Sequence, residues 1–418
     1  MDAITQHVRA LCEKAHAAAP HLALTDGDTR DRALFAMAQA LVDSTDAILA
    51  ANAQDLANAS ANGVPAVMMD RLRLTEARIS GIADAIRALI SLKDPLTGCE
   101  KTERPSGITI KKMRVPLGVV AIIFEARPNV TADAAALSIK SGNAVVLRGG
   151  KEAIESNRAI VAALKGALRS VGIDENAIGL VERTERESAN ALMEMRGLVD
   201  VLIPRGGKGL IRSCVDNSRV PVIETGAGNC HVYVDKDADL DKALAVTVNA
   251  KCQRPSVCNA AETLLLHRDV AAEFLPIFYR ATREWSLELR CDEAALAILP
   301  NAQPATEEDF ATEYNDYVMA VKVVDSVDEA IAHVNRYGTK HSEAIITEND
   351  AAAAKFLGMV DAAAVYHNAS TRFTDGGGFG FGAEIGISTQ KLHARGPMGL
   401  DALTTVKYAV FGNGAVRK

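Results

Sequence analysis

Aromatic residues are scarce in this sequence, where they make up 4% of 418 residues and include a single tryptophan. A hydrophobic core must therefore be built mainly from alanine, valine, leucine and isoleucine. Long apolar runs are missing too, because none reaches the roughly 18 residues that a membrane-spanning helix requires. The N-terminus also lacks the basic region followed by an apolar region that marks a secretion signal. These absences predict a soluble, cytoplasmic protein without a membrane partner.

The cysteines lack any spacing that would form a disulfide framework or a metal site. Their number is seven, which is odd, and no CxxC pair or His/Cys ligand pattern occurs. We expect reduced thiols, as in the cytosol, and interpret Cys230 and Cys252 as core filler. Positive charge is in short supply as well, since the net charge is −7. This balance argues against a nucleic-acid partner, although a local Arg/Lys cluster could still hold an anionic substrate.

Short apolar runs alternate with helical segments from residue 119 onward. Because these runs are apolar throughout, they predict parallel strands that helices cover on both faces. The fold class that follows is α/β with doubly wound domains, which bind ligands beyond the carboxyl ends of their strands. Expected strands of a first domain are 119–124, 144–147, 177–180, 199–203 and 220–223. Those of a second are 231–234, 262–267, 317–324, 343–347 and 362–366.

The first hundred residues show helical periodicity instead. They predict helices over 31–50 and 70–92, with Asp26 and Thr75 as N-caps. Much later, residues 290–316 are acidic and irregular, which indicates a surface crossing.

Two stretches, 108–115 and 402–411, alternate apolar with polar residues, as antiparallel or edge strands do. They could pair with each other or with another subunit. We therefore expect a small strand-based element that serves a homo-oligomer. The glycine cluster at 376–382 predicts a loop.

Cys258 is the leading candidate for a nucleophile. It lies on a polar turn between an apolar segment that ends near Ala250 and the strand expected at 262–267. Free cysteines are most often buried and inert, but one on such a turn is placed to meet a ligand. Glu224, in a glycine-rich turn upstream, could reach the same cleft.

Two turns could bind phosphate. Each follows an expected strand and precedes a helix, so backbone N–H groups would point at an anion, and each adds basic side chains. The alternative is an ordinary tight turn with solvated lysines, and no strand is followed by GxGxxG. The first turn contains Arg148 and Lys151, and the second contains Arg205, Gly206 and Gly207.

Several other polar residues are candidates for substrate contacts. Arg127 could hold an anionic group. Asn129 could donate its amide to a developing oxyanion or, equally, cap the following helix. Ser370, Thr371 and Arg372 suit a small substrate with a carboxylate or phosphate, or belong to a solvated loop.

Taken together, these segments resemble the aldehyde dehydrogenase superfamily over nearly the whole chain. Val115–Phe124 and Gly142–Arg148 look like its first two nucleotide-domain strands. The resemblance implies that Cys258 is the nucleophile and that Glu224 falls on the general-base position. It also implies that Arg148 contacts the adenosine ribose, Arg205–Gly207 the phosphates and Glu313 the nicotinamide ribose. A reductase that forms phosphate needs no water-activating base, so we place Glu224 among the cofactor contacts.

Four strings more closely resemble the gamma-glutamyl phosphate reductase family within that superfamily: Glu125–Thr131, Gln253–Asn259, Asn368–Gly377 and Ser388–Gly399. This resemblance implies reduction of L-glutamyl 5-phosphate by NADPH to L-glutamate 5-semialdehyde and phosphate in proline biosynthesis. The step would proceed through a thioester on Cys258, with no metal. The alternative is an NAD(P)-dependent dehydrogenase that oxidises a small acidic aldehyde.

The resemblance further implies a contact with glutamate 5-kinase, besides the homo-oligomer.

It also implies separate domains along the chain. Residues 1–100 and 117–228, with part of 380–400, would bind NADP. Residues 229–375 would carry the nucleophile, and residues 101–116 and 401–418 would be oligomerisation strands.

Overall fold

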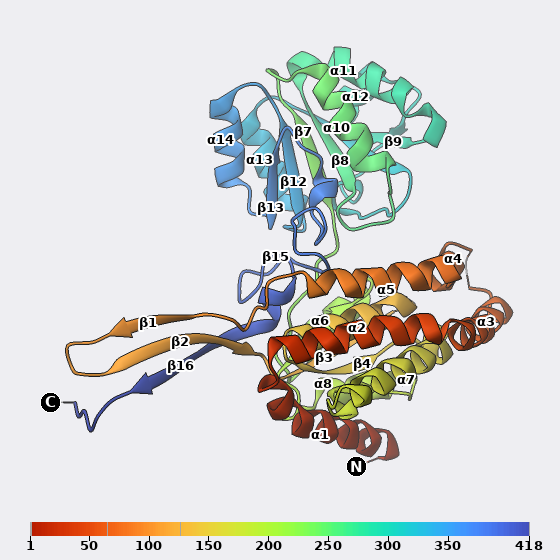
Figure 1. Cartoon of the computed structure of the whole chain (residues 1–418). Coiled ribbons are helices and arrows are strands. Elements are labelled where there is room, and N and C mark those ends of the chain that lie inside the picture. Colours follow the sequence, from red (N-terminus) through yellow and green to blue (C-terminus); the bar gives the residue numbers. More distant parts are fainter. Residues whose placement is uncertain (1, 65, 126, 418) are drawn as a thin grey trace. The chain divides into compact units, whose positions relative to one another are not determined.

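The computed structural model describes residues 2–64, 66–125 and 127–417 and contains two compact units (Figure 1). Ala126, in one of the strings quoted above, lies outside the described residues, as do Met1, Pro65 and Lys418. Unit 1 comprises Met1–Glu224, Gly380–Gly386 and Met398–Lys418. Unit 2 comprises Thr225–Phe379 and Ile387–Pro397. The main division therefore falls after Glu224.

Helices form the start of unit 1. They are α1 Ala3–Ala23, α2 Gly27–Asp43, α3 Thr45–Ala61, α4 Ala66–Leu72 and α5 Glu76–Ile90. The two predicted N-caps are confirmed. Asp26 accepts the Thr29 N–H (2.7 Å), and Thr75 accepts the Arg78 N–H (3.2 Å).

The single helix predicted over 31–50 is wrong, because the chain bends by 65° between α2 and α3. Thr45 donates its hydroxyl to the Val42 carbonyl (2.7 Å). Such a bond competes with the helical hydrogen bonds and bends the helix. Among the described residues, no single helix has the length and hydropathy to cross a membrane, and only this bent pair meets those criteria when taken together.

The sheet of unit 1 is parallel, with the strand order β5-β4-β3-β6. Its elements are β3 Val119–Phe124, α6 Pro128–Lys140, β4 Ala144–Arg148, α7 Ile154–Ser170, β5 Ile178–Leu180, α8 Arg186–Met193, β6 Val201–Arg205 and α9 Lys208–Asn217. Four of the predicted strands are thus confirmed. The strand predicted over 220–223 is wrong, since only Val222 bridges to Leu202 and Pro221 has no N–H to donate.

The sheet of unit 2 is also parallel, in the order β10-β9-β11-β8-β7-β12-β13. Its strands are β7 Cys230–Val234, β8 Ala261–His267, β9 Glu288–Cys291, β10 Gln303–Pro304, β11 Val318–Val324, β12 Ser342–Ile346 and β13 Ala364–His367. Its helices are α10 Leu240–Cys252, α11 Arg268–Ala281, α12 Glu293–Ile298, α13 Val327–Tyr337 and α14 Asp350–Met359. The five strands predicted for this domain are confirmed.

Helices cover both faces of this second sheet (Figure 1). Leu264 and Leu266 of β8 join a buried cluster with α10, α11 and α12. Leu265 joins a second cluster with α13 and α14. Alternate side chains of one strand therefore pack into two cores on opposite faces of the sheet, as a doubly wound sheet requires.

The irregular crossing predicted over 290–316 is wrong in its first part, which contains the end of β9, helix α12 and β10. Asp292 starts this helix by accepting the Ala295 N–H (2.9 Å), and its second oxygen accepts the Val323 N–H from β11 (3.2 Å). The acidic side chain that made the segment look solvated is therefore a helix cap tied to the sheet.

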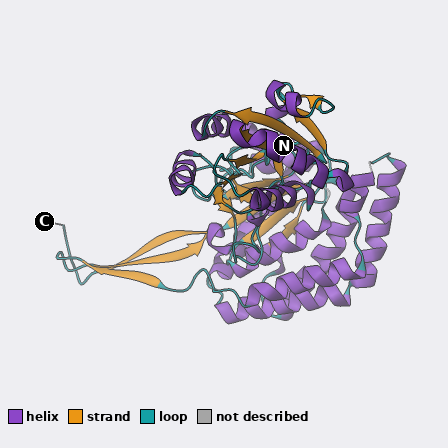
Figure 2. Ribbon diagram, turned by 90° about the horizontal axis from the view of Figure 1, so that it is seen from above, coloured by secondary structure: helices purple, strands orange, loops and turns teal. Residues whose placement is uncertain are grey.

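A three-stranded antiparallel sheet extends from the rest of unit 1 as an arm (Figures 1 and 2). It consists of β1 Cys99–Glu103, β2 Thr109–Pro116 and β16 Thr404–Phe411. The predicted pairing of the two alternating stretches within one chain is confirmed, from Thr404 opposite Pro116 to Phe411 opposite Thr109. Strand β1 had no signal strong enough to predict it.

The remaining elements are short. In unit 2, β14 Ile387–Ser388 pairs with β15 Gly396–Pro397. Single turns of 3-10 helix are η1 Lys151–Ala153, η2 Glu175–Ala177 and η6 Leu400–Leu403 in unit 1, and η3 Arg283–Trp285, η4 Asp309–Ala311 and η5 Thr371–Phe373 in unit 2. The glycine cluster at 376–382 forms turns, as predicted.

Candidate active site

Cys258 lies on a tight turn at the amino end of a central strand of unit 2. The Ala260 N–H donates to the Val257 carbonyl (3.0 Å), so Cys258 and Asn259 are the two central residues of a β-turn. Strand β8 begins directly afterwards. The turn therefore lies at the amino edge of the sheet, opposite the edge at which doubly wound domains were expected to bind ligands.

Cys258 differs from the other cysteines in its exposure. Five cysteines are buried and Cys99 is exposed, whereas Cys258 is partly exposed. Burial raises the pKa of Cys12 and Cys291 to about 12 and that of Cys214 to about 11. Because a thiol reacts as its thiolate, these buried groups are poor nucleophiles. Cys258 is the thiol of unit 2 that solvent reaches.

The segment Gly228–Cys230 packs directly against the backbone of Cys258. A Cβ atom at Gly228 would lie 1.4 Å from the Cys258 carbonyl oxygen, so only glycine fits there. The Cys230 thiol donates a hydrogen bond to the same oxygen (3.2 Å). The Gly228 N–H in turn donates to Glu313 Oε1 (2.8 Å), which ties the segment to the loop after η4.

The 370–375 segment holds the turn at its next residue, Asn259. Thr371 is fully buried and donates its hydroxyl to the Asn259 carbonyl (2.7 Å). The Asn259 amide donates to the carbonyls of Arg372 (3.3 Å) and Thr374 (3.1 Å), and Arg372 Nη1 donates to Asn259 Oδ1. Both the main chain and the side chain of Asn259 are therefore fixed.

Arg372 also brings positive charge to this turn. Its Nε donates to Gln253 Oε1 (3.1 Å). Burial lowers the pKa of Arg372 and nearby Arg254 lowers it further, while Asp375 and Cys258 oppose the shift. Arg372 is thus close enough to Cys258 for the two groups to interact electrostatically.

The two predicted carboxylates lie in different units. Glu224 ends the first segment of unit 1 and is partly buried. Glu313 belongs to unit 2, where one of its oxygens holds the Gly228 backbone. Their predicted contacts with the cofactor stay predictions.

Strands β3 and β6 are neighbours and end side by side at the carboxyl edge of the first sheet. The chain leaves β3 toward β4 and later returns on the other side as β6, so these ends flank the switch point of the sheet. Glu125 Oε2 accepts the Gly207 N–H (3.0 Å). A Cβ at Gly206 would lie 2.6 Å from the Glu125 carboxyl carbon. The predicted phosphate turn of Arg205, Gly206 and Gly207 therefore lies where such sheets bind ligands.

Asn129 does not cap a helix, so that prediction is wrong. Helix α6 begins at Pro128, which suits the first helical position because it lacks an N–H, and Arg127 is the N-cap residue. Asn129 donates Nδ2 to Asp133 Oδ2 (3.1 Å). Burial raises the pKa of Asp133 to about 6, against the opposing effects of this hydrogen bond and of Arg205.

Arg148 is anchored at the end of β4. Its Nη2 donates to the carbonyls of Thr184 (2.9 Å) and Glu185 (3.2 Å), and its Nε donates to Ser188 Oγ (3.3 Å). Nη1 makes no hydrogen bond to any residue that the structure describes. Lys151, at the start of η1, is exposed. Arg148 Nη1 and the Lys151 ammonium thus make no hydrogen bond to the residues that the structure describes.

Comparison with known proteins places this geometry in a family. Residues 1–309 match the model of the aldehyde dehydrogenase family. The curated gamma-glutamyl phosphate reductase of Enterococcus faecalis is 56% identical over 98% of this chain and 99% of its own length. This chain belongs to the aldehyde dehydrogenase family.

Two solved structures have the same fold as this chain. The crystal structure of gamma-glutamyl phosphate reductase from Thermotoga maritima has a TM-score of 0.96 at 46% identity and covers 99% of this chain and 100% of its own. An engineered glycolyl-CoA reductase with bound NADP⁺ has a TM-score of 0.71 at 16% identity, covering 97% of this chain and 96% of its own.

Sequence reasoning about this aldehyde dehydrogenase family member missed Gly228 and Cys230. Gly228 lies in the glycine-rich turn that carries Glu224, and Cys230, two residues later, was interpreted as core filler. It is indeed fully buried, yet its thiol contacts the Cys258 backbone. The only available signal was a second cysteine just before a predicted strand, which is too weak to indicate a contact between residues far apart in the chain.

Proposed function

We propose that this protein reduces L-glutamyl 5-phosphate with NADPH to L-glutamate 5-semialdehyde and phosphate, a step of proline biosynthesis. The observation that carries the proposal is the partly exposed Cys258 thiol, held on a turn beside the Arg372 guanidinium. Curated relatives that are more than half identical over nearly the full chain support the choice of substrate.

The chain's own groups suffice for the acyl-transfer half of the reaction. The Cys258 thiolate attacks the acyl carbon, the tetrahedral adduct expels phosphate, and a thioester forms. When bound, NADPH supplies the hydride that reduces this thioester. The resulting thiohemiacetal breaks its C–S bond, which releases the aldehyde and returns the thiolate. Main-chain N–H groups at the turn stabilise the oxyanion of each adduct, and the oxyanion role of Asn129 stays a prediction.

The NADPH assignment depends on the carboxyl edge of the unit 1 sheet. The glycine turn at Gly206 and Gly207 links the carboxyl end of β6 to the start of α9, where a phosphate could replace the Glu125 carboxylate as the acceptor of the Gly207 N–H. Arg148 and Lys151 fit a 2′-phosphate, because Arg148 keeps Nη1 open and Lys151 is exposed. The residues present therefore fit the cofactor.

Two variants test this cofactor choice. Lys151→Ala removes a charge that makes no hydrogen bond to the described residues, so it is the cleaner change. Arg148→Ala also frees the start of α8. We expect both to raise KM for NADPH far more than KM for NADH, and equal effects on both cofactors would refute the assignment.

Contacts with the substrate are proposed for Arg127, Ser370, Thr371 and Arg372. Arg372 is the strongest candidate, because its Nε and Nη1 are occupied by the turn while Nη2 makes no hydrogen bond to a described residue. Thr371 is fully buried and its hydroxyl holds Asn259, so its part would be to support the turn.

An assay that generates glutamyl phosphate enzymatically and follows NADPH absorbance tests the reaction. Cys258→Ala should abolish turnover and leave NADPH binding unchanged. Substantial residual reduction of glutamyl phosphate by this variant would rule out the mechanism. In reverse, oxidation of the semialdehyde should require phosphate. Oxidation without phosphate would instead favour the aldehyde-oxidising alternative.

We also propose a homo-oligomer that uses the arm, in the cytoplasm. Strand β16 leaves large apolar side chains in solvent, with exposed fractions of 61% for Tyr408, 58% for Val410 and 53% for Phe411. Contiguous exposed apolar side chains often mark an interface. Changing Val410 and Phe411 together to glutamate should lower the mass seen in sedimentation, and an unchanged mass would refute this. The contact with glutamate 5-kinase stays a prediction.

A further inference from the structure

The orientation of the peptide between Cys258 and Asn259 decides which way the Asn259 N–H points from the β-turn that carries Cys258. The central peptide of a β-turn can flip and convert one turn type into another, provided that the second central residue tolerates a positive φ. Asparagine tolerates it better than most residues. Asn259 nevertheless does not have a positive φ in the structure. The turn therefore holds its central peptide in one orientation, and contacts from outside the turn add to that preference.

Cys230 makes the contact that acts on this peptide directly. Its thiol is fully buried and donates to the Cys258 carbonyl oxygen at 3.2 Å. The carbonyl can approach so closely because Gly228, two residues earlier, has no Cβ to collide with it. The Gly228–Cys230 segment thus holds the Cys258 carbonyl group in place.

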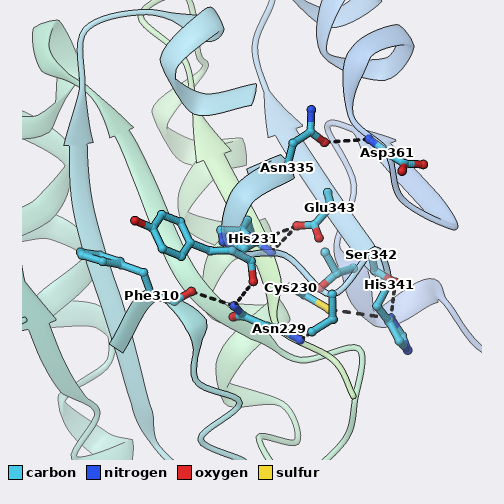
Figure 3. Close-up of polar contacts among 12 residues, drawn as sticks. Asn229, Cys230, His231, Phe310, Asn335, His341, Ser342, Glu343 and Asp361 are labelled. Carbon is cyan, nitrogen blue, oxygen red and sulfur yellow. Dashed lines mark hydrogen bonds and ion pairs between the residues drawn. The ribbon is translucent and has the colours of Figure 1, made fainter. Parts of the chain in front are cut away.

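A series of polar contacts connects the Cys230 thiol to His341, Ser342 and Thr374 (Figure 3). His341 Nδ1 lies 3.8 Å from the Cys230 sulfur and 2.8 Å from Ser342 Oγ. Ser342 Oγ donates to Thr374 Oγ1 at 2.6 Å. Thr374 also accepts the Asn259 amide through its carbonyl, so the series closes a ring of contacts around the turn. Burial lowers the pKa of His341 to about 4, which leaves this ring uncharged at neutral pH.

The strands that carry these residues are themselves tied together. The His231 N–H and ring Nδ1 both lie within hydrogen-bond distance of Glu343 Oε2, at 2.7 and 2.9 Å. Burial lowers the pKa of His231 to about 3 and raises that of Glu343 well above its usual range, so burial disfavours the charged form of both groups. Figure 3 shows the pair next to Cys230, where it locks β7 to β12.

We propose that Cys230 is a positioning residue for the nucleophile, because its thiol fixes the Cys258–Asn259 peptide in one orientation. The C=O and N–H of a trans peptide point in opposite directions. A carbonyl held inward by Cys230 therefore turns the Asn259 N–H the other way. That N–H makes no hydrogen bond to any described residue, so it is available to the oxyanion on the acyl carbon. The inference rests on the proposed role of Cys258.

Three variants separate positioning from simple core packing. Cys230→Ala removes the donor, and Cys230→Ser keeps one. Cys291→Ala is the matched control, because Cys291 is an equally buried thiol in β9 whose loss leaves the turn untouched. We expect kcat of Cys230→Ala to fall about three- to tenfold, the effect of one hydrogen bond. KM for NADPH should not change, Cys230→Ser should recover most of kcat, and Cys291→Ala should keep it.

Alkylation of Cys258 by iodoacetamide supplies a second measurement. Alkylation creates no oxyanion, so the rate at Cys258, read by peptide mass spectrometry across pH, should be the same in Cys230→Ala and the wild type. Equal kcat for Cys230→Ala and Cys291→Ala, or no recovery in Cys230→Ser, would overturn the positioning role. A wild-type enzyme that stays active after complete alkylation at Cys258 would overturn the proposed function instead.

Discussion

The buried ion pair between Lys251 and Glu262 allows a quantitative prediction about the stability of unit 2. Lys251 ends α10, Glu262 begins β8, and both side chains are 0% exposed with Nζ 2.5 Å from Oε2. Burial raises the pKa of Glu262 to about 7 and lowers that of Lys251, so desolvation outweighs their mutual attraction at both groups. Removing one partner of a buried pair typically costs about 3–5 kcal/mol, whereas replacing both is often nearly neutral.

We therefore expect the double variant Lys251→Met with Glu262→Gln to be close to the wild type and each single variant to be about 3–5 kcal/mol less stable. The single variants should also respond to pH in opposite ways. In Lys251→Met the remaining Glu262 has a folded-state pKa above its unfolded value, so stability is lost as pH rises. In Glu262→Gln the remaining Lys251 has a lowered folded-state pKa, so stability is lost as pH falls. Each slope approaches about 1.4 kcal/mol per pH unit relative to the double variant.

Urea unfolding followed by tryptophan fluorescence measures the stability of unit 2. Trp285 is the only tryptophan, and it packs against the apolar cluster of α10, α11 and β8. Unfolding curves between pH 6 and 8 give the free energy for each variant from the midpoint and the slope. If both single variants follow the pH dependence of the double variant, the pair is not a desolvated charge pair and the reasoning fails.

Three further predictions concern the turn and the core of unit 1. Gly228→Ala should lower kcat by roughly 100-fold or more, because a misplacement of about 1 Å can cost that much; Gly81→Ala, where a Cβ meets nothing, is the control, and equal activities would contradict the close approach. The raised folded-state pKa of Asp133 should make unit 1 lose stability as pH rises from about 4 to about 6. Asp133→Asn should remove this loss, and an unchanged pH dependence of the melting temperature would count against it. Asn52→Ala breaks three buried hydrogen bonds, so it should cost about 2–3 kcal/mol in unit 1 by circular dichroism without moving the tryptophan transition.

The sequence predicted the strands of both parallel sheets well because apolar residues dominate them. All residues of β3 and β8 are buried, and such runs have few other structural interpretations. The bend at Thr45 could not be predicted, because Leu41 and Ile48 still fall on one helical face across it. The bend depends on which carbonyl the Thr45 hydroxyl bonds, and periodicity carries no information on that.

The candidate site shows the same division between local and long-range information. A polar turn between two buried elements was enough to single out Cys258. The contacts of Thr371 were not predictable, since a hydroxyl in a polar string is as consistent with a solvated loop as with a buried support. The Cys230 contact depends on two strands meeting in the sheet, and a single sequence does not reveal such meetings.

Unit 1 is assembled from three pieces of the chain, and this has a consequence for its synthesis. Strand β2 is made early, but its partner β16 follows the whole of unit 2. On the ribosome, one edge of β2 must therefore wait without its partner until residues 404–411 emerge. An unpaired strand edge can capture another nascent chain. Slow translation or a missing C-terminal segment should therefore harm recovery of this protein more than equal delays elsewhere.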